Sequence, residues 1–164
     1  AYNSAPSYFR GAISVLPFGL LGEMLQDGGN PWRGMIYGMT NRLPWSGQNP
    51  ARIWKVWDEF GIEEARMVGY WSADCPVKTD NPDVLATAYV KEGEVLVSLA
   101  SWAKEPVDCR LKIDWEALNM NEPNARLYAP EIPDFQPEAD FRPGDPIPVE
   151  PGKGWLLILK STTR

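Results

Sequence analysis

The spacing of apolar residues changes along the chain. Up to about residue 80 they recur at both helical and strand spacings, and beyond it they mostly alternate with polar residues. Recurrence every three or four residues is typical of amphipathic helices, whereas strict alternation is typical of strands with one buried face. The pattern predicts a mixed segment followed by an all-β segment.

Two helices are predicted in the first segment. Residues 15–27 carry leucine and methionine side chains at helical spacing. Residues 49–60 have clearer ends: Asn49 can cap free N–H groups, and Pro50 suits the first helical position because its missing N–H would be unpaired there. Their apolar residues recur at i, i+3, i+4 and i+7, and Gly61 suits the left-handed position that ends a helix.

Short apolar runs on either side of the second helix predict strands. Residues 35–37, Met-Ile-Tyr, indicate a short buried strand, and residues 65–71, "ARMVGYW", indicate another. A strand, a helix and a second strand in this order form a βαβ unit. Parallel pairing through a right-handed crossover is the usual outcome of such a unit.

Beyond residue 80 the pattern predicts antiparallel strands. Glu92–Gly93 is a hairpin turn signal between two apolar runs. Residues 107–113 alternate strictly, as expected of one strand with a wet face. Further strands are predicted in 125–132, 146–151 and 154–160. Several short strands separated by turns indicate an antiparallel β-sandwich.

Composition excludes several classes of function. The 164 residues are 44% hydrophobic and 23% charged, as in a globular protein, and the net charge is −6 without a basic run, which argues against binding nucleic acid. No apolar stretch is long enough to span a membrane. The sequence contains no His, so Ser–His and Cys–His nucleophile systems and the commonest metal ligand are missing. We expect no metal site and no cofactor.

Cys75 and Cys109 leave two possibilities open. Both thiols can be reduced and buried, since free Cys is often buried as a small hydrophobic residue. Alternatively, a disulfide between them would close a long loop.

Two long runs resemble parts of glycoside hydrolases. Residues 87–132 and the closing strand "IPVEPGKGWLLILK", residues 147–160, resemble the C-terminal β-sandwich that follows the barrel in many of these enzymes. The upstream runs "LPFGLLGEML", "RGMIYGMTNR", "IWKVWDEFGI" and "GYW…CPVKTD" resemble the end of the barrel in a group of secreted bacterial proteins. That group is similar to glycoside hydrolase family 123.

The resemblance implies a mixed fold in two parts. Residues 1–80 would be the last βα units of a TIM-like (β/α) barrel, and residues 81–164 a C-terminal antiparallel β-sandwich. A complete barrel takes roughly 250 residues. We therefore expect the C-terminal part of a longer or split protein, with the remainder of the barrel and a carbohydrate as partners. By the same resemblance, the protein would be secreted or periplasmic.

Asp74 is the one candidate for catalysis. Glycosidases usually use two carboxylates flanking the scissile bond, and in a barrel these sit at the C-terminal ends of strands. Asp74 is the only acid just beyond a predicted barrel strand. A solvated or turn-capping role is the alternative, and a catalytic pair is expected mainly outside this chain.

Aromatic and Arg residues are better candidates for sugar contacts. Sugar faces stack on aromatic rings, and hydroxyls accept hydrogen bonds from the forked Arg side chain. Tyr70 and Trp71 end one predicted strand, and Tyr37 and Arg42 follow the other. Strand alternation would let only one of Tyr70 and Trp71 point into the barrel. Packing between barrel and sandwich is the alternative for each aromatic side chain.

A different class of function stays open. A stand-alone carbohydrate-binding or interaction module would carry no chemistry and would need two or three Trp side chains on one exposed sheet face. Trp102 and Trp155 lie on predicted strands and could contribute to such a platform.

Overall fold

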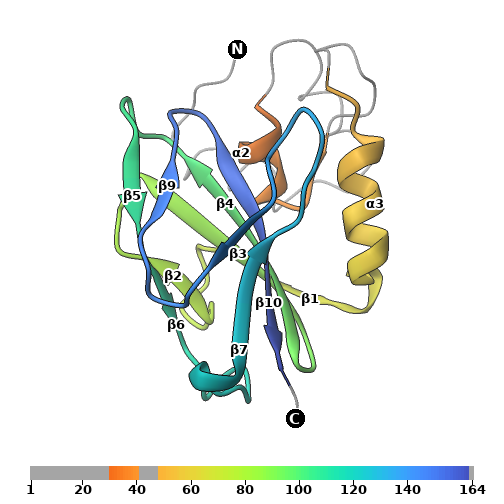
Figure 1. Cartoon of the computed structure of the whole chain (residues 1–164), viewed down its shortest axis with the longest axis vertical. Helices are drawn as coiled ribbons and strands as arrows, with labels where there is room; N and C mark the ends of the chain where they lie inside the picture. The colour runs from red at the N-terminus through yellow and green to blue at the C-terminus, as the bar shows by residue number, and fades with distance from the viewer. Residues whose placement is uncertain (1–29, 41–47, 163–164) are drawn as a thin grey trace.

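A computed structural model of the chain describes residues 30–40 and 48–162 (Figure 1). Its centre is a six-stranded antiparallel sheet with the strand order β1-β3-β4-β10-β7-β8. These strands are β1 (Arg66–Val68), β3 (Val84–Lys91), β4 (Glu94–Ser101), β7 (Ala125–Ala129), β8 (Ala139–Phe141) and β10 (Gly154–Ser161). The helix predicted over residues 15–27 lies outside the described residues.

Two short ladders lie over one face of this sheet. β2 (Val77–Thr79) pairs with β6 (Leu111–Ile113), and β5 (Val107–Cys109) pairs with β9 (Ile147–Val149), both antiparallel. The predicted antiparallel sandwich is therefore confirmed. The single strand expected over 107–113 is wrong, because the chain changes pairing partner at Arg110, although its alternation of buried and exposed side chains holds.

Two helices cover the opposite face of the six-stranded sheet (Figure 1). These are α2 (Pro31–Met35) and α3 (Ala51–Phe60), and α3 is followed by the 3₁₀ turn η3 (Ile62–Glu64). A second 3₁₀ turn, η4 (Glu122–Asn124), leads into β7. The fold is thus three layers thick, with strands on one side of the central sheet and helices on the other.

Helix α3 matches its sequence signals. The Asn49 side-chain oxygen accepts a hydrogen bond from the Ala51 backbone N–H at 3.0 Å, and Pro50 has helical backbone angles. Gly61 ends the helix in the left-handed conformation at φ 73°, which a residue with a side chain rarely adopts. The apolar face turns inward and contains three buried side chains, Ile53, Val56 and Phe60.

The strand predicted over Met35–Tyr37 is wrong, and so is the βαβ unit. Met35 ends α2, and a turn follows it. Asn30 caps this helix by accepting a hydrogen bond from the Arg33 N–H at 3.1 Å, and Pro31 is its first residue. An Asn-Pro pair therefore precedes or begins this helix as it does α3. Moreover, β1 pairs antiparallel with β3, so no parallel crossover joins it to the residues before α3.

The register of the central strands creates two separate cores. Alternate residues of β3, β4 and β10 face the small ladders, where they form the strand-side core with β2, β5, β6 and β9. The intervening residues face α2 and α3 and form the helix-side core. Gly154 lets β10 approach β4 closely because it has no β-carbon. A β-carbon at this position would overlap the Leu99 carbonyl oxygen.

Cys75 and Cys109 are both buried in the strand-side core and are free thiols. The reduced alternative is the one the structure supports.

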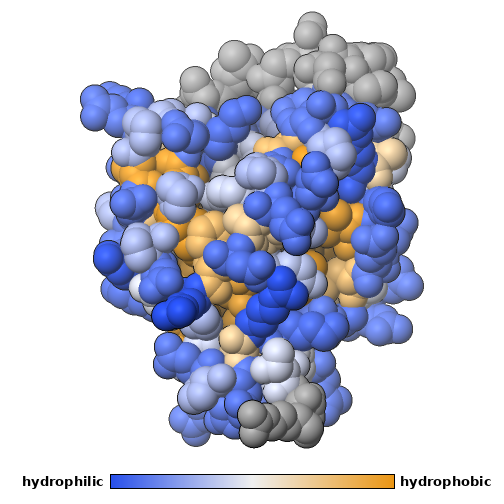
Figure 2. Space-filling view, in the orientation of Figure 1, coloured by the Kyte–Doolittle hydropathy of each residue, from blue (hydrophilic) through white to orange (hydrophobic). Residues whose placement is uncertain are grey.

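On the face seen in Figure 2, hydrophilic side chains cover most of the surface, and apolar side chains show between them over the centre. No helix among residues 30–40 and 48–162 is long and apolar enough to cross a membrane.

Candidate functional site

The segment 69–76 connects the two layers of strands. It leaves β1 at the edge of the central sheet and enters β2 in the covering ladder. The Cys75 sulfur lies 3.3 Å from the Val68 carbonyl oxygen and 3.2 Å from that of Val77, so one thiol contacts both ends of the connection. The second half of this segment is therefore a fixed link between layers.

The first half of the same segment joins an aromatic cluster made of Tyr37, Tyr70 and Trp71. The Tyr37 and Trp71 rings are stacked, with centroids 5.7 Å apart and 14° between their planes. Tyr70 meets both rings edge-on, and its hydroxyl lies 3.0 Å from the Tyr37 hydroxyl. Offset and edge-to-face pairs of this kind are favourable beyond the area they bury. Three predicted sugar-contact residues are thus brought together.

Trp71 is the exposed member of the aromatic cluster. It is 38% exposed, whereas Tyr37 is buried and Tyr70 is half-buried. A β-carbon on Gly69 would overlap the Trp71 ring, so the ring lies directly against the backbone there. β1 ends at Val68, and Tyr70 and Trp71 lie in the turn after it, so the expected strand alternation does not apply to them.

Arg42, the fourth predicted sugar-contact residue, lies outside the described residues. The cluster therefore consists of aromatic side chains with two phenolic hydroxyl groups, and it offers a ring face and polar atoms side by side. A stacked sugar ring with hydroxyl groups at its edge is the kind of ligand that such a surface can contact.

Asp74 has the properties of an ionised surface carboxylate. It is exposed, accepts a hydrogen bond from the Ser72 hydroxyl and lies 3.8 Å from Arg66. The Ser72 hydrogen bond, a backbone hydrogen bond and the nearby Arg66 and Lys78 charges lower the pKa of Asp74 below its ordinary value. A general acid needs a pKa raised toward neutrality, so these surroundings do not suit that role.

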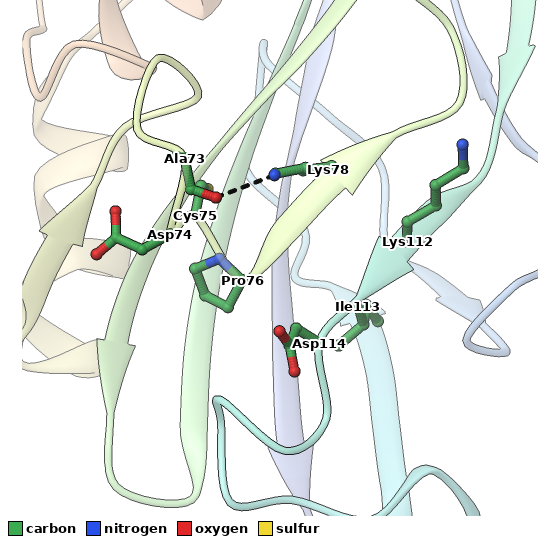
Figure 3. Close-up of a pocket in the computed structure, with 8 residues that line it drawn as sticks. All are labelled: Ala73, Asp74, Cys75, Pro76, Lys78, Lys112, Ile113 and Asp114. Atoms are coloured by element: carbon green, nitrogen blue, oxygen red, sulfur yellow. Dashed lines mark hydrogen bonds between the residues drawn. The ribbon is translucent and has the colours of Figure 1, made fainter.

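A shallow pocket of about 280 Å³ lies beside Asp74, between the connecting segment and the end of β6 (Figure 3). Lys78 crosses it and donates a hydrogen bond to the Ala73 carbonyl oxygen at 3.1 Å. The Asp74 carboxylate points away from Asp114, toward the β1 side.

Sequence reasoning missed Asp114 as a lining residue of this pocket. Asp114 accepts a hydrogen bond from the Ala117 N–H at 3.0 Å, so it also stabilises a turn. An acid three residues before that N–H was the available signal. Across the described part of the chain, no three Cys, Asp or Glu side chains gather as a metal site would require.

The two tryptophans considered for a flat platform lie on opposite sides of the central sheet. Trp102 packs on the helix-side core, with the Arg33 guanidinium 4.8 Å from its ring centre. Trp155 packs on the strand-side core against Phe141, and its indole N–H donates to the Pro148 carbonyl oxygen at 2.7 Å. The structure thus does not bring Trp102 and Trp155 together on one face.

The class of the protein comes from comparison with family models, which match both parts of the chain. Residues 49–160 match the C-terminal domain of glycoside hydrolase 123, and residues 1–44 match the TIM-barrel domain of glycoside hydrolase 123. The chain therefore belongs to glycoside hydrolase family 123. Neither the search of curated proteins nor that of solved structures gave a match.

The aromatic cluster spans both family matches. Tyr37 lies in the stretch matched by the barrel domain, and Tyr70 and Trp71 lie in the stretch matched by the C-terminal domain. The boundary near residue 80, suggested by the change of period, stays a prediction.

Proposed function

We propose that this chain is the C-terminal portion of a carbohydrate-active glycoside hydrolase, in which the cluster of Tyr37, Tyr70 and Trp71 contacts the sugar. The sandwich domain braces the barrel, and the remainder of the barrel supplies the catalytic carboxylates. Arg42 contributes a further donor to the sugar, and the protein works in a secreted or periplasmic setting. The family membership supports the hydrolase class.

The observation that carries the proposal is the exposed Trp71 ring held in place on Tyr37 and Gly69. An aromatic side chain that is already ordered loses little conformational freedom when a ligand stacks on it. The hydroxyl of the half-buried Tyr70 lies beside the stack, is held by the buried Tyr37 hydroxyl, and can exchange hydrogen bonds with sugar hydroxyls.

The position of the cluster also supports a contact close to the barrel. It joins the barrel match to the sandwich match, and the barrel match covers 44 residues where a complete barrel takes roughly 250. The catalytic pair of a family member therefore fits best on the other βα units. The ionised, ion-paired Asp74 agrees with a supporting place for this chain.

The test is Trp71→Ala in the enzyme with its complete barrel. Loss of the stacking face should weaken sugar binding about tenfold, which corresponds to roughly 1.4 kcal/mol, measured by calorimetry and by kcat/KM on chromogenic glycosides. Trp115→Ala is the matched control, since Trp115 is half-buried on the strand-side core and lies outside the cluster, and it should leave the affinity unchanged.

Gly69→Ala provides a second variant that keeps the indole but displaces it. We expect it to weaken sugar binding in the same direction as Trp71→Ala, because the added β-carbon occupies the place of the ring. Unchanged affinity in both variants with a lower melting temperature would show that Trp71 only packs. Full sugar affinity of the 164-residue chain in the absence of a barrel would instead favour a stand-alone binding module.

A further inference from the structure

The helix-side core contains unpaired polar atoms that the strand-side core does not. Among the residues that the structure describes, four buried side-chain atoms have no hydrogen-bond partner: the indole nitrogens of Trp32, Trp57 and Trp102, and the Ser98 hydroxyl. The three tryptophans all belong to or pack on the helix-side core, and Ser98 lies opposite Leu156 of that core in the β4–β10 register. An unpaired buried polar group costs about 1–3 kcal/mol. The helix-side core therefore carries a cost in stability that the strand-side core does not.

One flank of α3 on this face also exposes aromatic surface. Trp54 and Trp57 are three residues apart on the helix and so lie on neighbouring positions of one side. Trp54 is 40% exposed, and Trp57 is half-buried with its unpaired N–H. In the described part of the chain, Trp54 and Trp71 are the two exposed large hydrophobic residues.

Both exposed tryptophans contact the same short segment, residues 37–40. The Trp54 indole N–H donates to the Thr40 hydroxyl at 2.7 Å, and Trp71 stacks on Tyr37. This segment lies at the end of the barrel match, which covers residues 1–44. The aromatic flank of α3 is thus continuous with polypeptide of the barrel.

We propose that the flank of α3 formed by Trp54 and Trp57 is the surface on which the preceding βα units of the family 123 barrel dock. The inference rests on the proposed function, because it assumes that this chain works with a complete barrel. Aromatic residues with a polar atom are enriched at protein interfaces, and the exposed Trp54 ring beside the half-buried Trp57 ring offers such a surface.

The opposite side of α3 shows what a solvated surface looks like on the same helix. Lys55 and Glu59 form an i, i+4 ion pair at 3.7 Å, and both side chains are well exposed. Such a pair gains little in water and would lose its solvation under a partner. Docking is therefore expected on one flank of α3, and the other flank provides the control.

The experiment places the photoreactive amino acid p-benzoylphenylalanine at position 54, or at position 59 as control, in the enzyme with its complete barrel. After irradiation, mass spectrometry should find crosslinks from position 54 to barrel peptides other than residues 30–44, at least tenfold more abundant than those from position 59. Crosslinks to a second copy of the chain, or equal yields from both positions, would overturn the proposal.

A labelling measurement guards against poor incorporation of the crosslinker. Trp54→Cys should react with a maleimide at least tenfold more slowly than Glu59→Cys in the complete enzyme, as followed on the peptides that contain position 54 or 59, and the two native thiols of this chain do not interfere because both are buried. Equal rates would contradict docking. Sugar affinity is measured separately on Trp71→Ala, so that loss of the sugar effect with crosslinks intact would refute only the proposed sugar contact.

Discussion

The two faces of the central sheet are built from the same strands but differ in chemistry. The strand-side core is filled by aliphatic side chains and two thiols, and the one Trp N–H that β10 brings to it, from Trp155, is hydrogen-bonded. The helix-side core contains aromatic rings and buried hydroxyl groups. Among the described residues, it also contains every buried side-chain nitrogen or oxygen atom that has no hydrogen-bond partner. A face that is finished within a domain satisfies its polar atoms. The comparison separates a strand side whose buried polar atoms are satisfied from a helix side on which some stay unpaired, and the docking proposed above concerns only the helix side.

The largest expected effect compares two adjacent leucines of β10, both fully buried. Leu157 faces the strand-side core and Leu156 faces the helix-side core. Leu157→Ala should lower the free energy of unfolding by about 2–5 kcal/mol. The loss of unfolding free energy in Leu156→Ala should lie at the low end of this range. The five-residue α2 can settle into a cavity more easily than paired strands can. Urea denaturation of both variants measures the difference, and a larger cost at Leu156 would contradict the comparison.

An intermediate effect is expected at alkaline pH. Burial and the neighbouring Asp80 and Asp108 charges raise the pKa of the strand-side Cys109 thiol to about 12. Because the thiol ionises near pH 8.5 in the unfolded chain, its contribution to stability is fully present below that pH and is lost as the pH rises toward 12. The slope is at most about 1.4 kcal/mol per pH unit.

Two variants separate the faces in the alkaline measurement. Cys109→Ser should flatten the decline of unfolding free energy that begins near pH 8.5. Burial raises the pKa of the helix-side Tyr89 hydroxyl, which donates to the Met35 carbonyl oxygen at 2.6 Å, so Tyr89→Phe should flatten the decline only above about pH 10. If Cys109→Ser leaves the curve unchanged, the thiol is not protected by the strand-side core.

The smallest expected effect is at the surface, where neither core is involved. Asp74→Asn removes a carboxylate that is exposed and ion-paired with Arg66. We expect a small change in melting temperature and an unchanged kcat in the complete enzyme, measured beside Asp58→Asn as an exposed control on α3. A loss of kcat by several orders of magnitude would instead make Asp74 a catalytic residue.

Local sequence determined the elements whose signals lie within a few residues. The Glu92–Gly93 turn joins β3 to β4 as expected, the Asn49 side chain accepts a hydrogen bond from the first residue of α3, and Gly61 ends that helix. The alternation over residues 107–113 correctly predicted which side chains are buried. Periodicity and capping depend on near neighbours along the chain, so one sequence is enough to read them.

The candidate site was predictable in its residue types but not in its geometry. Aromatic residues near strand ends pointed to Tyr37, Tyr70 and Trp71, yet the stacking of Tyr37 on Trp71 joins residues far apart in the sequence. The position of the Trp71 ring also depends on the missing side chain of Gly69. Such contacts are set by how layers pack, which the local pattern does not specify.

Tertiary structure decided whether the short apolar run at Met35–Tyr37 forms a strand or a helix end, and in which direction β1 pairs. Three apolar residues fit a buried strand or the end of a helix equally well, and the Asn30 cap with burial under the sheet favours the helix. β1 joins the edge of the central sheet and pairs antiparallel with β3. Which edge a strand joins is a long-range choice, made by the total burial and backbone hydrogen bonding of the whole fold rather than by the strand itself.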